Sequence, residues 1–129
     1  MTSPEVTPVT KRLSQEQIAR YADAAGDHNP IHIDEAFARA TPFGGTIAHG
    51  MLVLAAISEM MAAALGEAWL TGGRLRVRFR AAARPGDAIT ASAQPQPAGS
   101  DGARVYAVEC RNQDGELLIS GTAEAPAGG

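Results

Sequence analysis

The stretch IAHGMLVLAAISEMMAAAL, residues 47–65, is nearly all apolar and decides the fold. Its length would suit a membrane span, but Glu59 lies within it, and an acidic residue near the centre of a span costs about 2.5–3.5 kcal/mol. No cluster of Lys or Arg flanks the stretch. A helix that is apolar on every side is more simply one buried by its own protein. The sequence therefore predicts a buried helix over about residues 49–65 and no association with a membrane.

The pattern changes from helical to alternating after this helix. Apolar residues alternate with arginines over residues 74–81, as is typical of a half-buried strand. Alternation returns over residues 89–93, 105–110 and 117–123, and turn-forming residues separate these segments at 85–87, 94–102 and 112–115. The second half of the chain is therefore predicted to be an antiparallel meander of three or four strands.

The segment before the apolar helix contains a short strand and short helices. Residues 5–13 can form an extended edge, because Pro8 is tolerated there. Ser14 and Gln17 predict a capped helix, which Gly26 is placed to end. Asp34 can cap a second helix that runs from Phe37 to Ala40. Residues 41–45, TPFGG, read as a loop.

These elements describe an α+β domain in which an antiparallel sheet wraps around one long apolar helix, the hot-dog fold. A chain of 129 residues fits one such domain over residues 1–129, with flexible ends at about 1–4 and 125–129. The unpaired edges of the sheet invite a second copy to extend it, so a dimer is expected.

Composition narrows the class of protein. A net charge of −3 gives no reason to expect nucleic acid as a partner. Cys110 is the single cysteine and cannot form an internal disulfide, and the first residues contain no apolar leader segment. Both features lead us to expect a cytoplasmic protein.

The stretch AGDHNPIH, residues 25–32, holds an unusual density of titratable groups. Pro30 prevents a continuous helix, so the chain turns between Asp27 and His32 and can bring them together. A carboxylate and an imidazole can hold one water and move its protons, which is hydration or dehydration chemistry. The alternative is a surface turn, in which Asp27 and Asn29 only bond their own backbone.

A metal site and a nucleophilic site are weaker alternatives. His28 and His32 have the spacing of helical zinc ligands, but Pro30 lies between them and no third ligand stands at a recognised offset. A nucleophilic triad built on Ser58 or Cys110 has no better support. We therefore expect no metal.

The start of the apolar helix is a second candidate feature. The first amides of a helix are unpaired and electropositive, and Gly50 lets a ligand approach them, so a carbonyl oxygen that gains charge can be held there. The alternative is that His49 and Gly50 only begin a core helix. Ser58 lies eight residues after Gly50, on roughly the same helix face, and either bonds back to the carbonyl of Leu54 or reaches into the site.

The arginine face of RLRVRFR, residues 74–80, also has two interpretations. A solvated strand face needs polar residues, which is the ordinary explanation. The other is a phosphate patch for a nucleotide-bearing thioester or an acidic carrier protein.

The stretches YADAAGDHNPIHIDEAFA and PFGGTIAHGML together resemble the MaoC-like, or hydratase 2, family. Members of that family are (R)-specific enoyl-CoA hydratases and 3-hydroxyacyl thioester dehydratases. The resemblance implies Asp27 and His32 as catalytic residues, with Asn29, the amide of Gly50 and Ser58 as oxyanion or substrate-binding groups. It also implies a dimer with the active site near the subunit contact and no metal.

The expected activity is the reversible addition of water to trans-2-enoyl thioesters. One alternative is a 3-hydroxyacyl-carrier-protein dehydratase of fatty acid or polyketide synthesis, and another is a hot-dog protein that binds acyl thioesters without catalysis. No cofactor is expected, since coenzyme A or phosphopantetheine enters as part of the substrate. The expected assembly is a homodimer, with a heterodimer with another hot-dog subunit as the alternative.

Overall fold

The computed structural model describes residues 3–128 of the chain, so residues 1–2 and 129 lie outside it. The ends that we expected to be flexible contribute to the sheet at two points. The amide of Ser3 donates to the carbonyl of Gln96 at 3.1 Å, and its hydroxyl accepts from the amide of Val105 at 2.8 Å. Ala125 is buried and pairs with Arg104. Ser3 and Ala125 thus each make contacts with the sheet.

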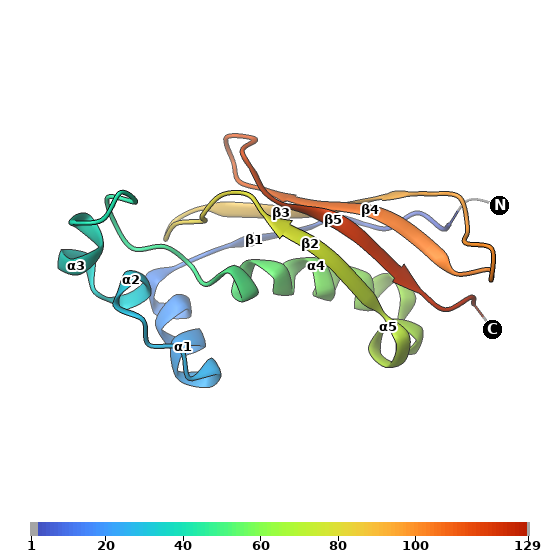
Figure 1. The fold of residues 1–129 in the computed structure, drawn as a ribbon, viewed down its shortest axis with the longest axis horizontal. Helices are drawn as coiled ribbons and strands as arrows, with labels where there is room; N and C mark the ends of the chain where they lie inside the picture. Colours follow the sequence, from blue (N-terminus) through green and yellow to red (C-terminus); the bar gives the residue numbers. More distant parts are fainter. Residues whose placement is uncertain (1–2, 129) are drawn as a thin grey trace.

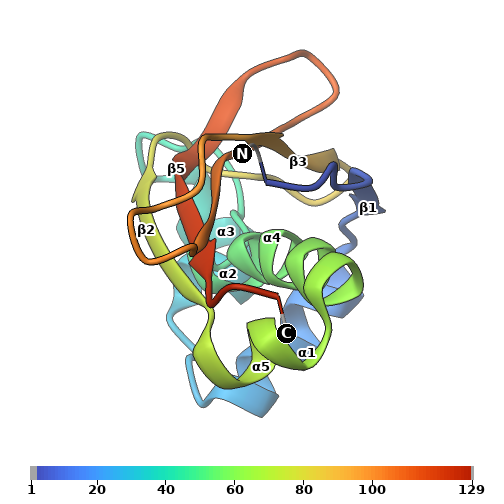
Figure 2. The same ribbon diagram turned by 90° about the vertical axis from the view of Figure 1, so that its right-hand side faces the viewer.

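The chain forms five helices and five strands within the described residues. In chain order they are β1 (Val9–Arg12), α1 (Gln15–Ala25), α2 (Pro30–Ile33), α3 (Glu35–Arg39), α4 (Gly50–Leu65), α5 (Glu67–Gly72), β2 (Arg74–Phe79), β3 (Ala88–Pro95), β4 (Arg104–Arg111) and β5 (Leu117–Ala125). The strands make one antiparallel sheet in the order β1-β3-β4-β5-β2. Figures 1 and 2 show this sheet curving around α4, which confirms the α+β hot-dog arrangement.

Helix α4 supplies one side of the core. Its buried residues are Val53, Ala56, Ile57, Met60 and Met61. They face the sheet residues that the alternating pattern turns inward, among them Ile89, Ala91 and Ala93 of β3 and Tyr106, Val108 and Cys110 of β4. Within residues 3–128, no helix is both long enough and apolar enough to cross a membrane.

The sheet departs from the predicted alternation at two places. A bulge between Cys110 and Arg111 shifts the register with β5, so that the neighbours Leu118 and Ile119 are both buried. Strand β2 ends at Phe79, whose side chain is 54% exposed, so the predicted strand residue Ala81 lies beyond it. Alternation within one strand carries no signal of a bulge in its pairing.

The helices α1, α2 and α3 lie beside the N-terminal end of α4, away from the sheet (Figure 1). The Ser14 hydroxyl caps α1 by accepting from the amide of Gln17 at 3.0 Å, and Gly26 ends it with φ of 71°. Asp34 caps α3 by accepting from the amide of Phe37. The loop that follows α3 then leads into α4. As a result, the bend after α1, this loop and the start of α4 lie close together.

Candidate active site

The bend after α1 is built by local hydrogen bonds to side chains. Asp27 Oδ1 accepts from the amide of Asn29 at 3.3 Å, and Asn29 Oδ1 accepts from the amide of Ile31 at 3.1 Å as the N-cap of α2. Pro30 stands in the first turn of α2, where its missing N–H costs nothing. The surface-turn interpretation is therefore correct for the backbone of this bend, and the structure gives Asn29 a capping contact.

The same bend brings Asp27 and His32 together. Asp27 Oδ2 lies 3.9 Å from His32 Nε2, and their side chains are 54% and 11% exposed. This distance is too long for a direct hydrogen bond and leaves room for one water between the two groups. The other ring nitrogen, Nδ1, lies 2.8 Å from the carbonyl of Ile47. Because a carbonyl only accepts, Nδ1 carries a hydrogen and Nε2 is the nitrogen that faces Asp27.

A second layer of hydrogen bonds holds the backbone of His32. Gln15 Nε2 donates to the carbonyl of His32 at 2.8 Å, and the hydroxyl of the buried Thr46 lies 2.7 Å from Gln15 Oε1. Glu35 Oε2 accepts from the amide of Thr46 at 3.3 Å. The hydrogen bond from that amide is the main reason that the pKa of Glu35 lies below its ordinary value. This network joins α1, α2, α3 and the loop before α4.

His49 is a member of the site that the sequence did not assign. Its side chain is 3% exposed, its Nε2 donates to the backbone carbonyl of Asp27 at 3.0 Å, and its ring stacks on that of His32 with centroids 3.7 Å apart. The ring of Tyr21 lies at 4.9 Å on a tilted plane. An imidazole inside an otherwise apolar run was the available signal, because buried polar side chains nearly always have a partner.

Gly50 begins α4 directly after His49. The side chain of the N-cap residue, His49, makes no capping hydrogen bond, so no cap occupies the first amides of this helix. An apolar pocket of about 320 Å³ opens beside Gly50 and is lined by residues that include Ile47, Ala48, Val53, Phe79 and Ala81. A Cβ on Gly50 would lie 2.9 Å from Phe79 Cε1, so this position has room for glycine alone unless the ring moves. The arrangement suits a ligand oxygen held by backbone amides.

Three residues from the sequence analysis lie away from this cluster. Ser58 Oγ accepts from Trp69 Nε1 at 3.1 Å, so the structure places it against α5 and does not bring it to His32. His28 pairs with Asp23 at 2.8 Å on the surface. Burial raises the pKa of the Cys110 thiol to about 11, so the thiolate that a nucleophile needs is scarce at neutral pH.

Asp27, His32 and His49 each offer a ligand atom within 4.8 Å of the others, so the cluster needs a test as a metal site. The two rings are stacked, with 25° between their planes. Because imidazole lone pairs lie in the ring plane, nearly parallel rings direct them side by side and away from one ion at about 2.0–2.1 Å. His32 Nδ1 and His49 Nε2 are also engaged by backbone carbonyls. This geometry suits a water better than a metal ion.

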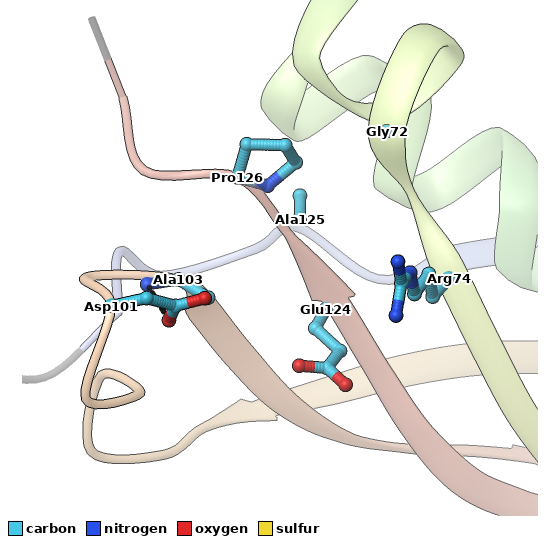
Figure 3. A pocket seen from close by; sticks show the side chains of 7 residues that line it. All are labelled: Gly72, Arg74, Asp101, Ala103, Glu124, Ala125 and Pro126. Atoms are coloured by element: carbon cyan, nitrogen blue, oxygen red, sulfur yellow. Dashed lines mark hydrogen bonds between the residues drawn. The ribbon is translucent and has the colours of Figure 1, made fainter.

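Two other pockets lack such chemistry. A pocket of about 220 Å³ lies between Gly72 at the end of α5 and Pro126 just after β5, at the opposite end of the molecule from α2 (Figures 1 and 3). Its lining includes Arg74, Asp101 and Glu124 but no imidazole or thiol. An open pocket of about 280 Å³ is lined by Arg76, Arg78 and Arg80 with Ser120 and Thr122. Among the described residues, these three arginines make no ion pair.

Comparison with known proteins agrees with this geometry. The family model described as "MaoC like domain" matches residues 2–114. The chain is 37% identical over 79 residues to the 3-hydroxybutyryl-CoA dehydratase of Methylorubrum extorquens, a match that covers 61% of this chain and 50% of that protein. The chain thus spans about half the length of this curated relative.

Two solved structures cover nearly the whole chain. The unliganded R-hydratase of Pseudomonas aeruginosa superimposes with a TM-score of 0.83 at 28% identity, covering 99% of this chain and 84% of that one. The (R)-hydratase of Aeromonas caviae involved in PHA biosynthesis gives 0.86 at 25% identity, covering 99% and 98%. With the family match over residues 2–114, the fold and the residues of the bend lead to one conclusion: this chain belongs to the MaoC-like domain family.

Proposed function

We propose that the protein is an (R)-specific hydratase that adds water reversibly to trans-2-enoyl thioesters. The observation that carries this proposal is the 3.9 Å gap between Asp27 Oδ2 and His32 Nε2, which fits one shared water. The names of the relatives support the same reaction, since they include a 3-hydroxybutyryl-CoA dehydratase and (R)-specific enoyl-CoA hydratases.

In the hydration direction, the shared water attacks C3 of the enoyl thioester. Its oxygen bonds to C3 while the carboxylate of Asp27 takes the proton that the water loses. The Nε2–H of protonated His32 gives a proton to C2, and transfer of the proton from Asp27 to His32 restores the starting state. Because both groups stand on one side of the substrate, the elements of water add to the same face.

The thioester oxygen gains negative charge while C3 is attacked. We assign its binding to the amide of Gly50, where the positive end of α4 adds to the stabilisation. The loss of one such donor typically costs about 2.7–4 kcal/mol of barrier. The apolar pocket beside Gly50 then accepts the neighbouring part of the substrate.

The substrate carrier and the assembly are the finer part of the proposal. We favour acyl-CoA over an acyl-carrier protein, because three of the relatives are named for CoA thioesters, one as a 3-hydroxybutyryl-CoA dehydratase and two as (R)-specific enoyl-CoA hydratases. The arginines that make no ion pair, Arg76 and Arg78 on β2 and Arg80 just after it, can bind the phosphates of either carrier. We favour a homodimer formed through the free edge of β2, and a cytoplasmic location.

The test uses purified protein and crotonyl-CoA. The proposal predicts loss of the conjugated thioester absorbance and formation of the (R)-3-hydroxybutyryl thioester, resolved by chiral chromatography. The Asp27→Asn/His32→Ala double variant, purified identically, reports any contaminating hydratase from the host and should be inactive. Turnover that is equal in both proteins, or binding of crotonyl-CoA without turnover, would reject the proposal, and the second result would favour a non-catalytic binder.

The same acyl group presented on coenzyme A and on a carrier protein separates the two carriers. We expect a higher kcat/KM for the CoA thioester. A preference for the carrier-protein thioester would instead identify a dehydratase of fatty acid or polyketide synthesis.

A further inference from the structure

We propose that His49 is a positioning residue that holds Asp27 and His32 at the separation that the shared water requires. This inference rests on the proposed function and adds a residue to it. His49 touches both members of the pair, through a hydrogen bond to the backbone of Asp27 at 3.0 Å and through a ring stack on His32 at 3.7 Å. No part of the reaction described above uses the side chain of His49.

The hydrogen bond fixes the tautomer of His49. The carbonyl of Asp27 can only accept, so Nε2 of His49 carries the hydrogen. The other nitrogen, Nδ1, is buried and has no hydrogen-bond partner among the described residues.

The two contacts act on groups that are otherwise held unequally. His32 is fixed at both ends, because its Nδ1 binds the carbonyl of Ile47 and its own carbonyl accepts from Gln15. Asp27 lies in the connection between α1 and α2 with its side chain 54% exposed, and its other bonds, from its amide to the carbonyl of Ala22 and from the amide of Asn29 to its Oδ1, are local to the bend. The bond from His49 ties the backbone of this exposed residue to the buried ring beside His32. The distance between the two reacting groups then depends on His49.

The position of His49 in the chain extends its role to the helix start. It is the N-cap residue of α4, where Ser, Thr, Asp and Asn are the usual residues because their side chains accept from the first amides. The His49 ring makes no such bond and reaches back to Asp27 instead. His49 therefore holds the backbone of Asp27 while it leaves the amide of Gly50 free for the thioester oxygen.

Three substitutions separate the two contacts. His49→Gln keeps an N–H near the position of Nε2 and removes the ring, His49→Phe keeps the ring and removes the donor, and His49→Ala removes both. We expect kcat for crotonyl-CoA to fall about tenfold in the Gln and Phe variants and about 100-fold in the Ala variant, with KM within about twofold of wild type. The matched control is the same series at His28, an exposed imidazole, where we expect no loss.

A second readout does not depend on turnover. The ¹³C chemical shift of the Asp27 carbonyl should lose its hydrogen-bond contribution in the Phe and Ala variants and retain it in the Gln variant. Circular dichroism and Tm identify variants that fail to fold, and assays well below the lowest Tm exclude unfolding as the cause of a lower kcat.

The outcomes separate the two proposals. An inactive wild type rejects the proposed function, and the carbonyl shift then decides the positioning role alone. An active wild type with unchanged kcat in His49→Ala rejects the positioning role. A change in KM with kcat unaltered also rejects it, because that result would assign His49 to substrate binding.

Discussion

The chain carries two aspartate–histidine pairs with the same five-residue spacing, in two different environments. Asp23 and His28 meet directly at 2.8 Å, with side chains 79% and 54% exposed. Asp27 and His32 stay 3.9 Å apart, and the imidazole is only 11% exposed. We call these the outer pair and the inner pair. In the outer pair the two side chains contact each other directly, whereas the inner pair is held by contacts with neighbouring elements.

The difference shows that spacing alone does not make a catalytic pair. The His32 ring is bonded at Nδ1, stacked on one face and backed by the network through Gln15 and Thr46. Those contacts come from the first residue of α1 and from the loop that leads into α4, and those made directly to His32 span at least 15 positions of the sequence. They leave one ring nitrogen and one carboxylate facing a gap, and a pair with an open gap can bind a reacting water.

The largest expected effect comes from removing the imidazole of the inner pair, and removal of the imidazole of the outer pair is the comparison. His32→Ala should lower kcat by about 10²–10⁴-fold, the usual contribution of a positioned acid or base. His28→Ala should change kcat by no more than about twofold, as is usual for exposed residues. Steady-state hydration of crotonyl-CoA measures both. Equal losses in the two variants would remove the distinction between the pairs.

The second prediction concerns the helix start, which lies beside the inner pair only. In Gly50→Ala the new Cβ meets the ring of Phe79, which must move into the apolar pocket. We expect kcat/KM to fall about tenfold. The double variant Gly50→Ala/Phe79→Leu should recover part of this loss because the smaller side chain makes room. A Gly50→Ala variant with wild-type kcat/KM would show that the position of the Phe79 ring and the adjacent pocket do not affect catalysis.

A smaller effect is expected on stability, through the network behind His32. The pKa of Glu35 is lowered from its ordinary value of 4.5, so its carboxylate stabilises the fold above that value and loses this contribution as the pH falls through the lowered pKa. Glu35→Gln should therefore lower Tm at neutral pH, and the difference from wild type should vanish in acid. Asp114→Asn, in the exposed turn between β4 and β5, is the matched control. A difference in Tm that persists in acid would contradict this assignment.

The smallest effect is expected at the outer pair itself. When His28 is protonated, Asp23→Asn should cost about 0.2–1 kcal/mol of the free energy of unfolding at low ionic strength, as the loss of exposed ion pairs does. Added salt should reduce that cost, because exposed charges are screened. Denaturant unfolding at two salt concentrations measures it. A larger cost that resists salt would mean that the outer pair is buried in solution.

Local signals in the sequence predicted much of the fold. The cap at Ser14, the stop at Gly26 and the cap at Asp34 were all confirmed, since each depends on residues within four positions. The buried helix and the alternating strands followed from periodicity. The bulge beside Cys110 and the short helix α5 were missed, because they depend on pairing and packing between distant segments. The short helix α2 was also missed, although its cap at Asn29 and Pro30 in its first turn are local signals.

Local signals also predicted part of the candidate site, and contacts between distant segments account for the rest. The bend at Pro30 indicated that Asp27 and His32 approach each other, and the structure places them there. The role of His49 needs the meeting of two segments separated by 22 positions, which spacing cannot reveal. Ser58 lies against Trp69 because α5 folds back on α4, and α5 had no signal of its own in the sequence.

The most direct test of the account compares the two carboxylates by isosteric removal of charge. Asp27→Asn and Asp23→Asn change the same atoms, each five residues before a histidine in the sequence, so any difference between them reports the environment. We predict that Asp27→Asn lowers kcat for hydration of crotonyl-CoA by about 10²–10⁴-fold, while Asp23→Asn stays within about twofold of wild type. An Asp27→Asn enzyme that turns over as fast as Asp23→Asn would contradict the central claim.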